Sequence, residues 1–202
     1  APEINRSYPE EPASAAKKEH SITMPVTTAK AMVGVKENVD GLTGEELVRG
    51  ELLSGMILDY YFSRSGVFYE ELYKNDLIDD SFQFETELDR QFGFTILGGD
   101  SRKPDEMASR IKEMLHELKE QRISDEDFTR MKRKKIGQFM RAMNSLEFIA
   151  NQFTHYHTLG TDLFEVLPII ESLTADDAEE YLQHWLKEDA ITVFQVKPQA
   201  NA

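Results

Sequence analysis

The five histidines are the residues that could bind a catalytic metal, and their spacing tests that possibility. They are His20, His116, His155, His157 and His184. A zinc hydrolase needs about three protein ligands and an open position for water. One helical solution is the motif His-x-x-Glu-His, which places two imidazoles and a carboxylate on one helix face. No segment of the sequence has this pattern. We therefore predict no metal site in this chain, and we expect it to be inactive as a hydrolase when it is alone.

Two histidine segments come nearest to a metal-binding pattern. His116-Glu117 has a carboxylate beside the imidazole, but no second histidine lies at the required offset. His155 and His157 are two residues apart, so they would point away from each other on a helix and share a face on an extended strand. Apolar residues at helical spacing precede them and favour the helix. We interpret all three as ordinary surface histidines, with a metal-binding pair at 155 and 157 as the alternative.

The sequence also lacks the motifs of serine hydrolases and of nucleotide-binding proteins. Ser65 lacks the Gly-x-Ser-x-Gly elbow of serine hydrolases. Gly98-Gly99 matches neither the phosphate-binding loop nor the dinucleotide fingerprint. We interpret this pair as a tight turn at the end of a strand, with a ligand-cradling loop as the alternative. The chain has no cysteine, which excludes thiol chemistry and disulfides.

Charge and hydropathy exclude further classes of function. The formal net charge of the 202 residues is -14, which disfavours binding to phosphate backbones, so we expect no nucleic-acid partner. No apolar run is long enough to cross a bilayer, and the first residues have no signal-peptide core, so we expect no membrane partner. The start at Ala1 indicates a processed or truncated chain, or removal of an initiator Met. A cytoplasmic location is the expectation, and the cysteine-free composition is compatible with it.

One basic window interrupts this acidic chain. Five of the six residues from Arg130 to Lys135 are basic. We interpret them as a solvated helix face paired with acidic neighbours. The alternative is a docking patch for an acidic partner or for a companion half of the same molecule.

The hydrophobic pattern predicts one α+β domain that would position these residues. Residues 1–19 are rich in proline and small residues and are expected to be a linker or arm; residues 20–198 form the domain, and 199–202 are a tail. Alternating or short apolar runs predict strands at 22–26, 29–35, 81–88, 92–97 and 190–196. Helical spacing predicts helices at 45–60, 67–77 and 104–118. It also predicts a long helix from 124 to 153 that is bent or interrupted near 144–145, a helix at 162–173 that Pro168 kinks or delays, and a last helix from 174. We expect a mainly antiparallel sheet with the helices on one face.

Four segments in this order resemble one half of the pitrilysin/insulinase-type zinc peptidases. The first is Met24-Pro25-Val26 with the strand and helix up to residue 60, and the second is the loop, short helix and strand of residues 66–82. The third is the strand at 94–99 with the helix at 104–118. The fourth is the long helix from 124, followed by Leu173-Thr174-Ala175-Asp176-Asp177 and the strand at 191–196. Glu71-Leu72-Tyr73 and Leu77-Ile78-Asp79 are more similar to a Gram-positive processing-protease-like branch of this family.

The resemblance implies a role without catalysis. Members of this family are built from paired homologous halves, of which the N-terminal half carries the zinc motif and the C-terminal half encloses the substrate. Because this chain lacks the motif, it is similar to the C-terminal part. Zinc, the general base and the peptide bond cleavage would then come from a missing N-terminal catalytic half or a homologous subunit. The alternative is an inactive scaffold or interaction domain of the same family.

The resemblance also implies two candidate substrate-binding positions. Many relatives carry an Arg and a Tyr that hold the substrate carbonyl near the zinc. By position, Tyr73 stands where that Arg would be, and Asp80 stands where that Tyr would be. A tyrosine has no permanent forked cation, and an aspartate cannot act as a phenolic donor. Because both residues depart from the family pattern, we assign no catalytic residue to this chain. By position alone, the resemblance implies that Tyr73 and Asp80 contact a peptide substrate.

Overall fold

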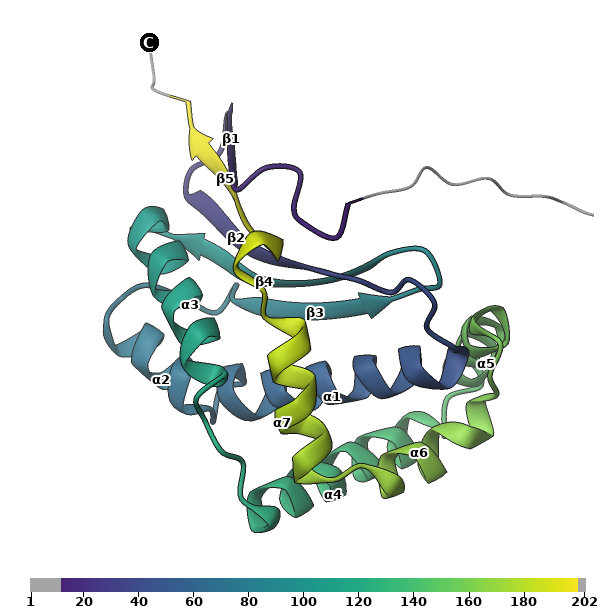
Figure 1. The fold of residues 1–202 in the computed structure, drawn as a ribbon. Helices are drawn as coiled ribbons and strands as arrows, with labels where there is room; N and C mark the ends of the chain where they lie inside the picture. Colours follow the sequence, from purple (N-terminus) through teal and green to yellow (C-terminus); the bar gives the residue numbers. More distant parts are fainter. Residues whose placement is uncertain (1–11, 200–202) are drawn as a thin grey trace, which may run out of the picture.

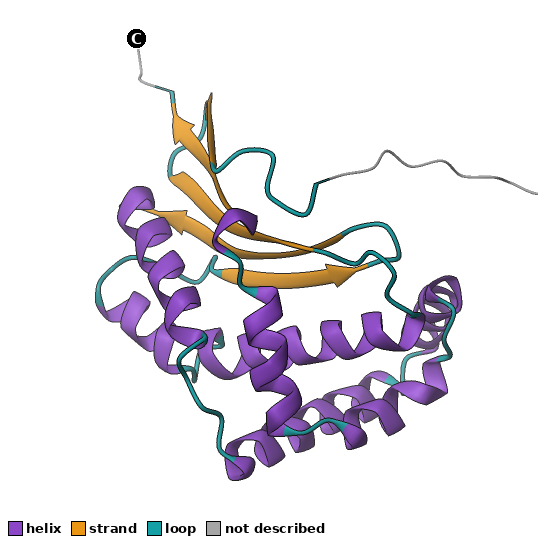
Figure 2. Ribbon diagram, in the orientation of Figure 1, coloured by secondary structure: helices purple, strands orange, loops and turns teal. Residues whose placement is uncertain are grey.

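The computed structural model describes residues 12–199, and these residues contain a five-stranded sheet (Figures 1 and 2). Its strands lie in the order β1-β5-β2-β4-β3. Only the pair of β1 and β5 is parallel, and the other three pairs are antiparallel. This confirms the predicted mainly antiparallel α+β fold. The strands are β1 (Glu19–Met24), β2 (Ala29–Glu37), β3 (Gln83–Leu88), β4 (Gly93–Ser101) and β5 (Ile191–Pro198).

The helices all lie on one side of this sheet, and Figure 2 shows no helix over its other face. Helix α3 packs directly on β2, β4 and β5, whereas α1 packs on β3. Helices α4 and α6 pack against each other and against α1, so they form an outer layer (Figure 1). The helical elements are α1 (Gly44–Phe62), α2 (Val67–Lys74), α3 (Pro104–Leu118), α4 (Asp125–Ala142), α5 (Leu146–Leu159), η1 (Leu163–Glu165), α6 (Val166–Ser172), α7 (Ala175–Trp185) and η2 (Glu188–Ala190).

The core lies between the sheet and the helices. Alternation along β2 turns Val33 and Val35 inward, and both are buried. Helix α1 places Leu47 and Ile57 against this face, and neither side chain is exposed to solvent. Each fully buried aliphatic side chain of this kind contributes about 1.5–3 kcal/mol to stability. The sheet and α1 therefore form the rigid support on which the other elements are placed.

Local signals set the helix ends. Thr43 and Glu46 form the capping box that starts α1, as the sequence predicts. The predicted interruption near residues 144–145 is confirmed, because Ser145 caps a separate helix α5 by accepting a hydrogen bond from the backbone N–H of Phe148. Helix α5 ends at Gly160, whose φ of 85° is favourable for glycine. Pro168 is the third residue of α6, so the helix begins late, which was one of the two expected outcomes.

Two predicted elements differ from the structure. The first strand spans Glu19–Met24 rather than 22–26, and it ends before Pro25, which has no N–H to donate. The prediction of a turn at Gly98-Gly99 is wrong, because both residues lie inside β4 and pair with Met32 and Ala31 of β2. Gly98 has a φ of 152°, and a Cβ atom there would lie 2.1 Å from the carbonyl oxygen of Ala31. The glycine therefore permits a close approach of two strands.

The expected arm and tail lie mostly outside the described residues, since residues 1–11 and 200–202 are not part of them. Of the arm, residues 15–18 run beside the start of β5. The backbone N–H of Ala15 donates to the carbonyl of Asp189, and Lys18 accepts from the N–H of Val193. Among the described helices, none combines the length and the apolar character that crossing a membrane requires.

Candidate functional site

The segment that the resemblance singles out lies on the surface. Tyr73 is near the end of α2, its side chain is 56% exposed, and its ring stacks on Tyr69 with centroids 6.1 Å apart. Asp80 is exposed in the following loop and forms an ion pair of 3.1 Å with Arg64. The two candidate residues therefore have different neighbours. Both are accessible to a large ligand.

The backbone that carries these two side chains is well anchored. Leu77 and Ile78 are buried, and the carbonyl of Leu77 accepts a hydrogen bond of 2.7 Å from the hydroxyl of Ser101 in β4. The hydroxyl of Ser81 accepts from the backbone N–H of Asp100, also in β4. The loop thus presents Tyr73 and Asp80 from a fixed position at one end of the sheet.

The histidines are dispersed over different elements. His155 and His157 lie on α5, which confirms the helical interpretation; His155 Nε2 is 3.8 Å from Glu51 Oε2, and His157 stacks on Phe153. His116 on α3 is 2.9 Å from Glu188. Within residues 12–199 no three His, Asp or Glu side chains are gathered in an arrangement that could hold a metal ion. The donor groups described here therefore do not fit a catalytic zinc ion.

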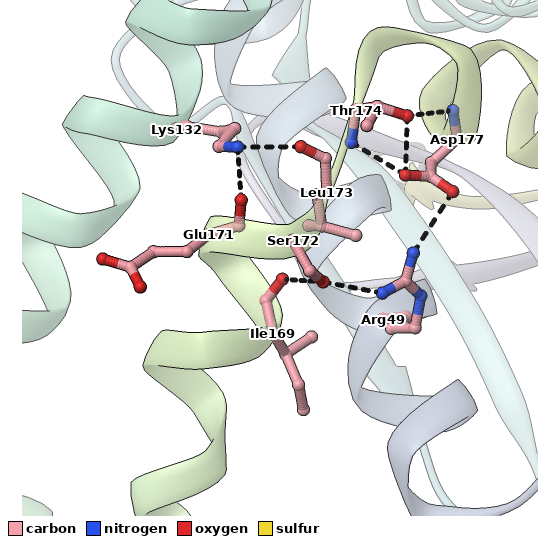
Figure 3. A network of polar contacts seen from close by, with 8 residues as sticks. All are labelled: Arg49, Lys132, Ile169, Glu171, Ser172, Leu173, Thr174 and Asp177. Carbon is pink, nitrogen blue, oxygen red and sulfur yellow. Dashed lines mark hydrogen bonds and ion pairs between the residues drawn. The ribbon is translucent and has the colours of Figure 1, made fainter.

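The basic window is largely used within the fold. Lys134 forms an ion pair of 2.6 Å with Asp59 on α1, and Arg130 pairs with Asp127. The ammonium of Lys132 donates to the carbonyls of Glu171 and Leu173, at 2.7 and 2.8 Å, and so caps the C-terminal end of α6 (Figure 3). These contacts support the interpretation as a helix face paired with its neighbours.

A second polar joint lies beside Lys132 in Figure 3 and connects three helices. Arg49 on α1 donates to the hydroxyl of Ser172 at the end of α6 and to the carboxylate of Asp177 at the start of α7, at 2.9 and 3.2 Å. Asp177 also completes the capping box of α7 with Thr174. Burial alone would raise the pKa of Asp177, but the hydrogen bonds from Thr174 and the cation of Arg49 lower it overall.

Arg49 and Asp177 form the rim of a cavity of about 440 Å³ between α1, α7 and the end of β2. Its apolar wall contains Leu42, Leu53 and Leu88. Tyr181 and Trp185 of α7 form its aromatic wall, and their rings stack at 5.5 Å. This volume falls in the range of small-molecule sites, which are typically apolar with a few convergent polar groups.

The central polar group of this cavity is the buried carboxylate of Glu37 at the end of β2. It accepts hydrogen bonds from the hydroxyl of Tyr181 at 2.5 Å and from that of Thr95 at 3.0 Å. Thr95 in turn lies 2.7 Å from the hydroxyl of Thr86 on β3. Burial is the largest influence and raises the pKa of Glu37 to about 7, although the two hydroxyl donors act in the opposite direction.

Trp185 provides an unused donor at the same place. Its side chain is buried, and its indole N–H has no hydrogen-bond acceptor among residues 12–199. The indole is close enough to Glu37 to lower the pKa of that carboxyl, yet the N–H does not reach hydrogen-bond geometry. It is therefore a nearby donor, and no bond to Glu37 is formed.

Sequence reasoning missed this cavity, although one signal was present. The side chains of Ala31, Val33 and Val35 point inward along β2. Because side chains alternate along a strand, the side chain of Glu37, two residues after Val35, points inward as well. A carboxylate on the buried face of a strand needs partners, which marks it as unusual. The partners themselves could not be foreseen, because Tyr181 lies 144 positions away in the sequence.

Comparison with known proteins agrees with the fold. The family described as the peptidase M16 inactive domain matches residues 2–135. A Bacillus subtilis (strain 168) protein named as the uncharacterized zinc protease YmfH is 37% identical over 199 residues, which are 98% of this chain and 46% of that protein. The chain thus spans less than half the length of this curated relative.

Solved structures give the same result. An M16-like peptidase from Alicyclobacillus acidocaldarius superposes with a TM-score of 0.87 at 29% identity, over 96% of this chain and 46% of the other. The inactive peptidase domain of a zinc protease from Bordetella parapertussis superposes with a TM-score of 0.71 at 14% identity, over 90% and 96% of the two chains. These matches confirm the resemblance to the pitrilysin/insulinase-type peptidases, and the chain belongs to the peptidase M16 inactive-domain family of zinc proteases.

Proposed function

We propose that this chain is the substrate-enclosing, non-catalytic part of a zinc metallopeptidase that cleaves peptides. The zinc ion and the general base would be supplied by a catalytic half that carries the His-x-x-Glu-His motif. The observation that carries the proposal is the match to an inactive peptidase domain in a chain whose described His, Asp and Glu side chains do not form a zinc site. Enclosure contributes to catalysis by orienting a flexible peptide and raising its effective concentration.

The uncovered face of the sheet supports this role. The residues that point away from the helices include several apolar side chains, which we call the open sheet face: Ile22, Met24, Met32, Phe94, Ile96 and Phe194. Phe194 and Ile22 are 37% exposed and Met24 is 45% exposed, and Phe194 pairs in register with both Met32 and His20. Contiguous exposed apolar surface of this kind is typical of an interaction surface.

The proposal assigns the surface segment a role in substrate contact. Tyr73 and Asp80 would touch the bound peptide from the end of α2 and the loop after it, where both are exposed. One structural neighbour, the ferredoxin protease FusC, is 15% identical to this chain and was solved in a complex with Arabidopsis ferredoxin. For this chain, a peptide substrate, a processing role, the catalytic partner half and a cytoplasmic location are all parts of the proposal.

Reconstitution tests the proposal directly. The chain is mixed with the half that carries the zinc motif, and cleavage of a fluorogenic peptide library is measured together with association by sedimentation. We expect the mixture to cleave peptides much faster than the catalytic half alone. Full activity of the catalytic half without association would refute the enclosing role.

A pair of matched variants makes this test specific to the open sheet face. Phe194→Asp places a charge on that face, whereas Phe164→Asp places the same charge on η1, where the side chain is already 65% exposed. We expect the first variant to weaken association or activity and the second to leave both unchanged. Equal behaviour of the two variants would show that the open sheet face is not the surface used.

An inactive scaffold domain is the second candidate function. It is favoured by the identities of Tyr73 and Asp80, because the resemblance implies an Arg and a Tyr at these two positions in a half that assists catalysis. Association with the partner half without any change in peptide cleavage would select this candidate.

A further inference from the structure

We propose that the cavity around Glu37 is a binding site for a primary amine attached to an apolar body and carrying a carbonyl group near the amine. Glu37 would pair with the ammonium, the indole N–H of Trp185 would donate to the carbonyl, and the aliphatic and aromatic walls would hold the apolar part. This site is distinct from the open sheet face and from the segment of Tyr73 and Asp80, so it does not depend on the proposed function.

The shape of the cavity suits such a ligand. A volume of about 440 Å³ accommodates a molecule with one aromatic ring and a short polar group. Leu42 at the mouth is 39% exposed, whereas Leu53, Leu88 and Trp185 deeper in the wall are buried. The cavity is therefore open to solvent at one side and enclosed at its base, where the ligand would lose water.

The polar groups at the base favour a cation. The two hydroxyl groups that donate to the Glu37 carboxylate, those of Tyr181 and Thr95, are neutral, and so is the nearby indole of Trp185, so the buried negative charge is hydrogen-bonded without being neutralised by these groups. A carboxylate can accept about four hydrogen bonds, which leaves room for an ammonium. Pairing a buried charge with an opposite charge offsets part of its desolvation cost.

The other charges around the cavity balance one another, which leaves Glu37 to set the preference for a cation. The other charged or titratable groups that line it, from β2, α1, α7 and the turn after α7, are Lys36, Glu46, Arg49, Asp177, Glu180, Tyr181, His184 and Lys187. Arg49 is already paired with Asp177. Lys36 and Lys187 offset Glu46 and Glu180, so the ionised carboxylate of Glu37 gives the lining a net charge of -1 (four carboxylates against three cations), which favours an approaching ammonium.

The unused indole donor supplies the second half of the recognition. A buried N–H without an acceptor costs free energy, and a ligand carbonyl would satisfy it. Because Trp185 and Glu37 line the same cavity, a ligand that carries an ammonium and a carbonyl on neighbouring carbons would engage both, with a small shift of the indole that brings its N–H, which is closed to solvent here, into the cavity. Free amines and the first residue of a peptide chain share this chemistry.

The only tryptophan of the sequence makes binding measurable, since excitation at 295 nm reports on Trp185 alone. The probes are phenylalaninamide, 2-phenylethylamine, which lacks the carbonyl, and N-acetylphenylalaninamide, which lacks the ammonium. Each is titrated into the full chain and checked by calorimetry. We expect saturable binding of phenylalaninamide, weaker binding of 2-phenylethylamine, and at least about tenfold weaker binding of the acetylated probe, because a charge-assisted hydrogen bond is lost. The peptides Phe-Gly-Gly and Gly-Gly-Phe-amide then distinguish a chain end with an apolar first residue from a free small amine.

The variant Glu37→Gln keeps the size of the side chain and removes its charge. We expect it to weaken phenylalaninamide by at least about tenfold and to leave the acetylated probe unchanged, which would also show that the cavity is still folded. Glu120→Gln removes one charge from an exposed residue after α3 and should bind like the original chain.

The pH dependence separates Glu37 from His184. As Glu37 becomes ionised, affinity for 2-phenylethylamine, whose alkyl ammonium keeps its proton across this range, should rise by about tenfold between pH 6 and 8, and Glu37→Gln should abolish this rise while His184→Gln retains it. No saturable binding, tighter binding of the acetylated probe, or equal affinity in Glu37→Gln would each overturn the proposal.

Discussion

The cavity around Glu37 and the segment from Tyr73 to Asp80 both present polar groups, but the fold treats them in opposite ways. Glu37 and Trp185 are buried, and Arg49 at the rim joins three helices. Tyr73 and Asp80 are exposed, and the partner of Asp80, Arg64, is itself 76% exposed. Burial makes a polar group depend on its partners, whereas exposure leaves it free for a ligand at little cost in stability. Four predictions test this contrast.

The largest effect is expected at Glu37. Its folded-state pKa of about 7 lies above the ordinary value of 4.5, so the folded protein binds this proton more tightly than the unfolded chain does. The resulting stabilisation is complete below about pH 4.5 and is lost as the pH rises through 7. Between pH 5 and 8, the free energy of unfolding of the original chain should therefore fall by about 2–3 kcal/mol more than that of Glu37→Gln. Urea unfolding across this pH range measures it, and parallel pH curves for the two proteins would contradict it.

The next largest effect on the free energy of unfolding is expected at Arg49, on the rim of the cavity. Arg49→Ala removes hydrogen bonds to Ser172 and Asp177, so the free energy of unfolding should fall by about 1–2 kcal/mol. Arg64→Ala is the matched control, because its single ion pair to Asp80 is exposed and should contribute less than about 0.5 kcal/mol. Thermal and urea unfolding of both variants give the comparison. Equal losses would mean that the two regions do not differ as described.

A smaller effect is expected at the cap of α6. Lys132→Met keeps the length of the side chain and removes the donor to the carbonyls of Glu171 and Leu173, which should cost about 1 kcal/mol. Lys134→Met removes only the ion pair with Asp59, in which the lysine side chain is 48% exposed, and should cost less. Hydrogen exchange at the end of α6 should accelerate in the first variant alone.

The smallest effect on stability is expected in the exposed segment. Tyr73→Ala should change the free energy of unfolding by less than about 0.5 kcal/mol, because only the stacking on Tyr69 is lost. In the reconstituted peptidase the same variant should raise KM by about fivefold with little change in kcat, as expected for loss of a substrate contact. An unchanged KM would remove Tyr73 from the proposed substrate surface.

Local patterns predicted most elements, because the signals for them are local. The alternation around Phe84 and Phe94 predicted the hairpin of β3 and β4, and Thr43 with Glu46 predicted the start of α1. Gly98 was misassigned because its role depends on the approach of β2, which no short window contains. Of the site, Tyr73 and Asp80 were indicated by resemblance, and their role is still untested. The cavity required Glu37, Tyr181 and Trp185 to meet across the whole chain, which only the tertiary structure determines.

The position of β5 has a consequence for how the molecule forms during synthesis. Among the strands of residues 12–199, β5 is the last in the sequence, yet it lies between β1 and β2 and is the one neighbour with which β1 pairs (Figure 1). Residues 19–24 must therefore wait for residues 193–198 before they can pair, whereas β2, β3 and β4 can assemble beforehand. Such distant pairing delays completion of the sheet until residues 193–198 have left the ribosome. A nascent chain that stalls before residue 191 would present two unpaired strand edges to chaperones and proteases.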